Sequence, residues 1–311
     1  MRTPQVDRAE GMPERVRIYE VGVRDGLQNE ENIVPVDVKA EFVRRLEAAG
    51  VETIETTSFV SPTWVPQLAD AAELLTALGE SARGRNRPVL VPNEKGLDRA
   101  LEAGVGAIAI FGSATEAFAA KNLNATVDGQ FDMFGPVAKR AKDEGLWVRA
   151  YVSMCFGDPW EGDVAPDQVV SVARRLMDLG CDELSIGDTI GVGTAGQVES
   201  VLDGLVEAGI SLDTIAVHFH DTYGQALPNT LTALRKGVTI VDSSAGGLGG
   251  CPYAKSATGN LATEDLLWAL HGLGIETGID LPAMVGTSMW MSEQLGKPPA
   301  SAVVKALGAP A

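Results

Sequence analysis

An alternation of short apolar runs with helical segments repeats along the chain and constrains its fold more than any other feature. About eight runs rich in β-branched or apolar residues end in polar residues or glycine. They cover residues 16–22, 51–59, 88–92, 107–112, 147–153, 184–187, 214–220 and 239–244. Segments with helical periodicity lie between them, most clearly at 36–49, 64–78, 136–144, 166–179, 197–207 and 225–235. Strands that alternate with helices pair in parallel.

The number of these units favours a closed α/β barrel. Eight strand–helix units in about 260 residues fit a (β/α)8 TIM barrel better than an open sheet. An open, doubly wound sheet shows the same alternation and is the alternative fold. We expect one domain over residues 1–311, with the barrel at about 16–280 and a short C-terminal helical extension at about 281–311 that covers one end.

Composition limits the classes of partner. The chain has 25 Lys and Arg against 42 Asp and Glu, a net charge of −17. The electrostatic field of such a negative charge repels nucleic acids and anionic membrane surfaces. The sequence contains no run of about 18 apolar residues, so no membrane span is predicted. An anionic small substrate would need a local positive site. Three cysteines and a polar N-terminus without a signal core predict a reducing, cytoplasmic location.

The tripeptide His218-Phe-His220 is the sharpest local chemical signal. Residues i and i+2 of a strand share a face, so both imidazoles point the same way and can chelate a divalent metal. The alternative is a pair of core histidines. In a closed barrel the first and last strands are neighbours, which brings Asp25 and Asn260 to the same corner. This set of nitrogen and oxygen ligands suits Mg²⁺ or Mn²⁺, while Zn²⁺ or Co²⁺ is possible.

Each of the other site candidates has a structural alternative. Asp25 could be a turn residue and Asn260 a helix N-cap. Arg24 can neutralise charge developing on a carbonyl or form an ordinary salt bridge. Strand alternation points Arg24 away from Asp25, so both reach the mouth only if the chain is already turning there. Cys251, in a glycine-rich loop, is either a nucleophile or proton donor, or an inert thiol.

Three further features carry weaker signals. Cys155 lies near the end of the fifth strand and could approach the site, whereas Cys181 and His271 are expected to be structural. Gly191–196 matches a dinucleotide fingerprint, but the acidic residue it requires would be Asp213, at the wrong end of the sheet. We interpret this segment as a loop whose amides could hold an anionic group. A nicotinamide-dependent oxidoreductase is the alternative from another functional class.

Several motifs together resemble the hydroxymethylglutaryl-CoA lyase family, one of the metal-dependent barrel lyases related to acyl-CoA condensing synthases. The motifs are Glu20-Val-Gly-Val-Arg-Asp-Gly-Leu-Gln-Asn-Glu, Ile54-Glu-Thr-Thr-Ser-Phe-Val-Ser-Pro, Gly187-Asp-Thr-Ile-Gly-Val-Gly-Thr, His218-Phe-His-Asp-Thr-Tyr-Gly-Gln-Ala, Gly246-Gly-Leu-Gly-Gly-Cys-Pro-Tyr-Ala, and Gly259-Asn-Leu-Ala-Thr-Glu. They span nearly the whole chain, and the cysteine loop joined to the two-histidine strand is highly specific.

The resemblance implies a role for each matched residue. It makes Asp25, His218, His220 and Asn260 metal ligands, and Arg24, Asp25, Cys251, Asp188 and Glu55 catalytic groups, with Arg24 on the thioester carbonyl. It gives Glu264 and Gln28 supporting roles, and Ser153 and Lys297 contacts with substrate or CoA. It further implies a divalent-metal cofactor, an acyl-CoA substrate and a homodimer.

The implied reaction is a metal-assisted cleavage of 3-hydroxy-3-methylglutaryl-CoA to acetyl-CoA and acetoacetate. A base, which could be Asp25, Asp188 or His218, takes the hydroxyl proton, and Cys251 protonates the departing enolate. The chain departs from the family pattern at Val23, where proline is common, and in 153–160, which we expect to line the acyl pocket. The alternative substrate is another 3-hydroxyacyl-CoA, either a longer branched one or citramalyl-CoA.

Overall fold

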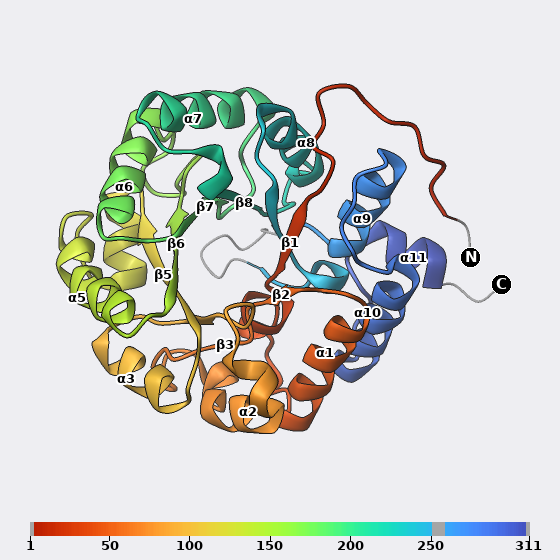
Figure 1. Ribbon diagram of the computed structural model, residues 1–311, viewed down its shortest axis with the longest axis horizontal. Helices are drawn as coiled ribbons and strands as arrows, with labels where there is room; N and C mark the ends of the chain where they lie inside the picture. The colour runs from red at the N-terminus through yellow and green to blue at the C-terminus, as the bar shows by residue number, and fades with distance from the viewer. Residues whose placement is uncertain (1–2, 251–258, 309–311) are drawn as a thin grey trace.

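The apolar runs of the sequence form parallel strands that curve into a ring with helices outside it (Figure 1). The computed structural model describes residues 3–250 and 259–308. The strands follow one another in the sheet as β2-β1-β9-β8-β7-β6-β5-β4-β3. Their bounds are β1 Arg17–Glu20, β2 Thr53–Ile54, β3 Thr57–Ser58, β4 Val89–Leu90, β5 Ala107–Ser113, β6 Trp147–Ser153, β7 Glu183–Asp188, β8 Ile215–Phe219 and β9 Ile240–Ser243.

Strands β2 and β3 are two halves of one run and close the barrel. β2 pairs with β1, whereas β3 pairs with β4. Between them, the Glu55 amide donates to the Glu20 carbonyl at 2.9 Å and the Thr56 amide to the Pro88 carbonyl at 3.1 Å. The two ends of the sheet are therefore one continuous segment. With β2 and β3 counted as a single strand, the barrel has eight strands. The predicted TIM barrel is confirmed, and the open sheet is excluded.

The helices surround this barrel and agree with most of the predicted segments. They are α1 Val36–Ala48, α2 Ala71–Leu78, α3 Glu94–Glu102, α4 Glu116–Phe118, α5 Gly129–Asp143, α6 Pro166–Asp178, α7 Ala195–Glu207, α8 Ala226–Lys236, α9 Thr263–Gly272, α10 Leu281–Leu295 and α11 Ala302–Gly308. The predicted start at Pro136 is wrong, because α5 begins at Gly129 and contains this proline in its interior. Proline is most common in the first turn of a helix, so a helix start at Pro136 matches the usual preference. This helix instead carries the proline in its interior.

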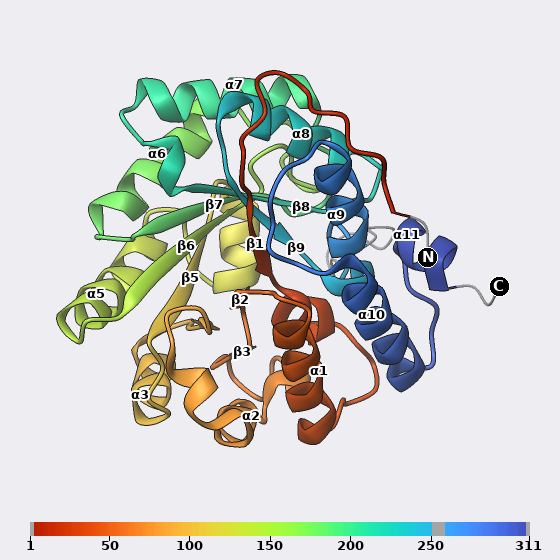
Figure 2. The same ribbon diagram turned by 45° about the vertical axis from the view of Figure 1, so that its right-hand side comes forward.

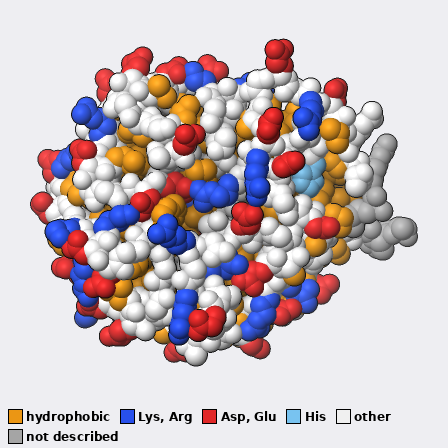
Figure 3. All heavy atoms as spheres, viewed as in Figure 1, with side chains coloured by type: hydrophobic (Ala, Val, Ile, Leu, Met, Phe, Trp, Pro, Cys, Tyr) orange, Lys and Arg blue, Asp and Glu red, His pale blue; other side chains and the backbone are white. Residues whose placement is uncertain are grey.

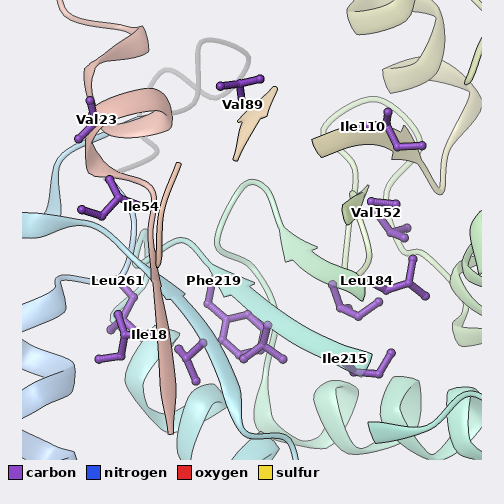
Figure 4. Close-up of a cluster of buried hydrophobic side chains, with 14 of the residues drawn as sticks. Ile18, Val23, Ile54, Val89, Ile110, Val152, Leu184, Ile215, Phe219 and Leu261 are labelled. Carbon is purple, nitrogen blue, oxygen red and sulfur yellow. The ribbon is translucent and has the colours of Figure 1, made fainter. Parts of the chain in front are cut away.

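The core lies between the strands and the helices. Alternate strand residues point outward and pack with helix residues such as Phe42 and Leu46 in one buried cluster. Figure 4 shows part of this layer, with Ile18, Ile54, Val89, Ile110, Val152, Leu184 and Ile215 contributed by successive strands. The period-two pattern of the sequence therefore sorts apolar side chains to the outer face of the barrel.

The inward face of the barrel is largely polar. Five buried side chains that alternate with the outer layer come from strands far apart in sequence: Tyr19, Arg149, Ser185, His218 and Asp242. A small apolar cluster of Leu90, Ala109 and Tyr151 accompanies them. Because buried polar groups require partners, the interior residues constrain one another's positions.

The C-terminal extension is helical, as predicted, but it lies on the flank of the barrel. Figures 1 and 2 show α10 beside α1, and α10 also contacts α9. The chain after α10 returns towards the β9 loop, where the amides of Ala300 and Ser301 donate to the Gly246 carbonyl at 2.9 and 3.1 Å. That residues 1–311 form one domain stays a prediction.

The surface and helix lengths show two further properties. Figure 3 shows acidic and basic side chains interspersed over the face it displays, so this face carries no extended surface of one sign. Within 3–250 and 259–308, no helix is both long and apolar enough to cross a membrane.

Removing a large side chain from the outer layer should destabilise the barrel strongly. Phe134 of α5 is fully buried, and its ring centroid lies 5.5 Å from that of Phe111. We expect Phe134→Ala to lower the free energy of unfolding by about 3–5 kcal/mol, measured by urea titration. The control Val206→Ala, at an α7 position that is 49% exposed, should change it by less than about 0.5 kcal/mol. Equal effects would contradict the assigned layer.

Candidate active site

A π-helical turn over Gly22–Gly26 follows β1 and carries Arg24 and Asp25. Its two glycines permit a close approach to neighbouring groups. A Cβ on Gly22 would lie 2.5 Å from Glu20 Oε1, and one on Gly26 would lie 2.9 Å from Ser244 Oγ. The turn breaks strand alternation at once, so both Arg24 and Asp25 reach the mouth. The sequence analysis required the chain to turn at this point for both residues to reach the mouth, and it does.

Asp25, His218 and His220 form a cluster suited to a cation. One ligand atom from each of the three lies within 4.8 Å of the others. Asp25 Oδ2 is 4.0 Å from His220 Nε2, and the two imidazole centroids are 5.3 Å apart. His218 and His220 are only 8% and 5% exposed. The structure thus brings the predicted pair of histidines together with the carboxylate.

Asn260 joins this cluster from the segment after the β9 loop. Its Nδ2 donates to Asp25 Oδ2 at 2.8 Å and to the Leu248 carbonyl at 3.0 Å. Its Oδ1 is buried and, like His220 Nδ1, has no hydrogen-bond partner within the described chain. Buried acceptors without partners are costly, so an amide oxygen left open beside a carboxylate and two imidazoles fits a cation-binding set.

The electrostatic environment favours the protonation states that metal ligands need. Burial alone would raise the pKa of Asp25, but the positive charge of Arg24, with contributions from both histidines, lowers it to about 2. Burial, together with the neighbouring His218, lowers the pKa of His220 to about 4. At neutral pH the site therefore presents a carboxylate and a neutral imidazole, the forms that bind divalent ions.

Arg24 is held on two sides. Its Nη1 donates to Asp25 Oδ1 at 2.7 Å, and its Nε forms an ion pair with Glu55. Glu55 also accepts hydrogen bonds from the hydroxyls of Tyr19, at 2.9 Å, and Tyr151. Both oxygens of Glu55 are therefore occupied, and this buried carboxylate orients Arg24. In the described part of the chain, Nη2 of Arg24 donates to no protein acceptor.

Asp188, at the end of β7, holds the loop that follows it. Its carboxylate accepts from the amides of Val192 at 3.0 Å and Gly193 at 2.8 Å. Burial raises the pKa of Asp188 to about 6 despite these bonds. Amides of this loop therefore hold an anionic group, as predicted, and that group is the carboxylate of Asp188 itself. Asp213 lies before β8, at the opposite end of the barrel, so the dinucleotide interpretation has no support.

Glu264 lies below the β9 loop rather than among the metal-ligand candidates. It accepts from the Gly246 amide at 2.9 Å and from the Ser288 hydroxyl. Glu20 accepts from the preceding amide, that of Ala245, at 2.9 Å. Burial raises the pKa of Glu264 to about 8 and that of Glu20 to about 7. These two carboxyl groups fix the first residues of the glycine-rich loop.

The remaining predicted residues occupy different places. Gln28 is half-buried just after the π-helical turn, and Ser153 ends β6 opposite Ser113 of β5. Lys297 forms an ion pair with Glu30 of the loop after β1. Cys251 lies outside the described residues.

Neither described cysteine is a site residue. Cys155 is fully buried in the outer core, where its thiol donates to the Val152 carbonyl at 3.0 Å. Its predicted approach to the site is therefore wrong. Burial raises the pKa of Cys181 to about 12, as expected for a structural thiol.

The sequence analysis missed the groups that support the histidines from inside the barrel. Asp242 of β9 contacts His218, and Arg149 of β6 contacts Asp242. Their signal was present as polar residues at alternate positions of otherwise apolar runs, such as Trp147-Val-Arg-Ala-Tyr-Val-Ser. In a barrel these positions face inward, where an unpaired charge is costly.

The HMGL-like family matches residues 15–290 of this chain. The chain belongs to that family. This match confirms the relationship that the motifs predicted. The mitochondrial hydroxymethylglutaryl-CoA lyase of Arabidopsis thaliana is 49% identical over 96% of this chain, which spans 64% of the length of that relative.

Solved structures agree with the family assignment. The hydroxymethylglutaryl-CoA lyase of Pseudomonas aeruginosa is 46% identical, with a TM-score of 0.92, and the match covers 97% of this chain and 100% of that one. An HMG-CoA lyase from Acinetobacter baumannii, solved with coenzyme A and 3-methylmalate, is 33% identical with a TM-score of 0.89, over 96% and 97% of the two chains.

The raised pKa of Glu264 predicts a specific pH dependence of stability. The folded state keeps this proton up to about pH 8, whereas the ordinary glutamate pKa is 4.5. The stabilising contribution is fully present below pH 4.5 and is lost as the pH rises through 8, with a slope approaching about 1.4 kcal/mol per pH unit. In Glu264→Gln, the unfolding free energy from urea titrations at pH 5 to 8 should therefore fall less steeply than in the wild type.

A matched variant separates this effect from general charge removal. Glu73→Gln alters an exposed carboxylate on α2 that makes no ion pair within the described residues, and its profile should run parallel to the wild type. Parallel profiles for Glu264→Gln and wild type would contradict the proton assigned to Glu264.

Proposed function

We propose that this chain is a divalent-metal-dependent carbon–carbon lyase that cleaves 3-hydroxy-3-methylglutaryl-CoA into acetyl-CoA and acetoacetate. One observation carries the proposal: Asp25, His218 and His220 converge within 4.8 Å beside the open amide oxygen of Asn260. This cluster lies next to Arg24 at the mouth of a barrel. The relatives named above as lyases of this substrate share the fold over nearly the whole chain.

The four residues Asp25, His218, His220 and Asn260 would hold the metal. Mg²⁺ or Mn²⁺ suits this set of nitrogen and oxygen donors best, and Zn²⁺ or Co²⁺ is the alternative. When bound, the metal would orient the substrate hydroxyl and lower its pKa.

The protein residues then divide the work of a retro-Claisen cleavage. A carboxylate takes the hydroxyl proton; the pKa of Asp188, about 6, matches this role better than that of Asp25, about 2. The electrons of the O–H bond form the ketone of acetoacetate, the carbon–carbon bond breaks, and its electron pair passes to the acetyl-CoA enolate. Arg24 stabilises the negative charge on the enolate oxygen. The Cys251 thiol donates its proton to the enolate carbon. The resulting thiolate then takes up the proton held by the base, which restores both groups.

The acyl-CoA contacts follow from the mouth of the barrel. Ser153 ends a strand at the mouth, and Lys297 can bind an anionic part of CoA once it leaves Glu30. The coenzyme A in the Acinetobacter baumannii relative supports this class of substrate.

A second candidate substrate is another 3-hydroxyacyl-CoA. Met154, next to Ser153, has a φ of 60°, which is strained for a residue with a side chain. Its side chain packs with Phe118 and Ile190 in an apolar cluster at the ends of β5 to β7. A cluster of this kind at the mouth could select the acyl group. The 3-methylmalate in the Acinetobacter baumannii relative, another hydroxy acid, supports this second candidate.

A homodimer in the cytoplasm completes the proposal. The two described cysteines, Cys155 and Cys181, are free and buried, which suits a reducing compartment. The homodimer rests on the family resemblance alone.

Acetoacetate release is the direct test of this function. We expect the purified chain to release acetoacetate from 3-hydroxy-3-methylglutaryl-CoA with Mg²⁺ or Mn²⁺, and to lose this activity with a chelator. Asp25→Asn should weaken Mn²⁺ binding by at least about tenfold, since loss of even an outer ligand partner costs about 10- to 100-fold. Calorimetric titration measures this affinity.

The control for the metal site is Asp37→Asn, at an exposed carboxylate in the first turn of α1. It should bind Mn²⁺ as the wild type does. Cleavage that persists in chelator would sink the metal dependence. Metal binding without cleavage of this thioester, but with cleavage of a branched or citramalyl analogue, would move the substrate to the second candidate.

Replacing the loop thiol tests its assignment as the proton donor. Cys251→Ala should lower kcat by about 10²- to 10⁴-fold, the usual range for a lost acid, while Mn²⁺ affinity stays within about twofold. Cys181→Ala, at a buried thiol remote from the mouth, is the matched control for loss of a sulfur. Near-normal turnover in Cys251→Ala would remove this residue from the mechanism.

A further inference from the structure

Asp242 is a buried carboxylate that lies directly behind His218 in the neighbouring strand. The register pairs it with His218 of β8 on one side and with Tyr19 of β1 on the other. Its side chain is inaccessible to solvent, and its Oδ2 lies 3.1 Å from His218 Nδ1. The same Oδ2 accepts from the Ser185 hydroxyl at 3.0 Å.

Arg149 fixes the charge of Asp242. Its Nη2 lies 2.5 Å from Asp242 Oδ1, and its Nε lies 3.3 Å from Glu183 Oε1. The guanidinium is fully buried and stacks on the Tyr19 ring at 3.6 Å from the centroid. A buried arginine keeps its proton, so the carboxylate against it is held as an anion. An ionised carboxylate can only accept hydrogen bonds.

The tautomer of His218 follows from this partner. Since Asp242 can only accept, Nδ1 of His218 must carry a hydrogen, and in the neutral ring Nε2 is then the nitrogen with the free lone pair. Nδ1 is engaged behind the ring, which leaves Nε2 as the atom that can join the cluster with Asp25 and His220. By contrast, Nδ1 of His220 has no hydrogen-bond partner in the described residues. The barrel interior therefore fixes one of the two imidazoles in advance.

We propose that Asp242 is a positioning residue that holds His218 in its Nδ1–H tautomer and presents Nε2 for metal coordination. This inference rests on the proposed metal site and adds a residue outside the ligand set. A carboxylate behind a ligating imidazole fixes the orientation of the ring and raises the basicity of the ligand. Arg149 supports the arrangement by holding Asp242 in place from the opposite side.

The first test uses the wild-type protein without metal. The chain has only three histidines, so ¹⁵N-labelled imidazoles can be assigned by comparison with His218→Gln and His271→Gln. We expect long-range ¹H–¹⁵N correlation spectra at pH 8 to show His218 protonated at Nδ1. Protonation at Nε2 would overturn the proposal without any need for a variant at Asp242.

The second test changes Asp242 itself. Asp242→Asn keeps the size of the side chain but can turn an N–H group towards Nδ1, which favours the Nε2–H tautomer. We expect that tautomer in the ¹⁵N spectrum and a loss of Mn²⁺ affinity of about 10- to 100-fold by calorimetry. Ser185→Ala is the control, because it removes another partner of Oδ2 and leaves the carboxylate in place. In this control variant His218 should remain in the Nδ1–H tautomer.

The outcomes separate this inference from the function on which it rests. A wild type that binds no Mn²⁺ overturns the metal site and this inference with it. Normal binding in the wild type together with equal binding in a folded Asp242→Asn overturns the inference alone. Circular dichroism establishes folding; if the variant does not fold, the wild-type tautomer decides.

Discussion

The buried charge of Arg149 is the constraint on which the interior of this barrel depends. A guanidinium taken out of water costs several kcal/mol unless charged partners surround it. Asp242 and Glu183 supply those partners, and Glu183 is in turn paired with Arg17 near the opposite end of the barrel. Because Asp242 must face Arg149, it also lies against His218. The position of a candidate ligand is thus a consequence of how the barrel neutralises a charge in its interior.

A second set of contacts connects Arg149 with Arg24 at the mouth of the barrel. The Tyr19 and Tyr151 rings lie 3.6 and 5.0 Å from the Arg149 guanidinium, and both hydroxyls donate to Glu55. Glu55 then orients Arg24. A connected set of buried polar groups therefore supports both the candidate cation site and Arg24, the residue proposed to face the thioester. The ion pairs and hydrogen bonds of these groups constrain the side chains at the mouth, although Nε and Nη1 of Arg149 make no hydrogen bond within the described residues.

The sequence predicts those parts of the structure that follow from short periods. Strand–helix alternation gave the barrel, the two-residue period gave the common direction of His218 and His220, and barrel closure gave the meeting of Asp25 with Asn260. It could not predict that Asp242 pairs with Arg149, because 93 residues separate them and no local pattern encodes the contact. It also could not show that the loop after β7 bonds its own aspartate, since a glycine-rich segment permits either arrangement.

The closure of the barrel and the assembly of the site are the same structural event. Asp25 follows the first strand of the barrel, β1, and Asn260 follows the last, β9; a hydrogen bond of 2.8 Å joins the two side chains. Asn260 also bonds the Leu248 carbonyl, so the start of the glycine-rich loop is joined to the same contact. Strands β1 and β9, which Asp25 and Asn260 follow, are paired in the closed barrel. If β9 were shifted by one residue relative to its neighbours, its inward side chains would turn outward, and both His218 and Arg149 would lose Asp242.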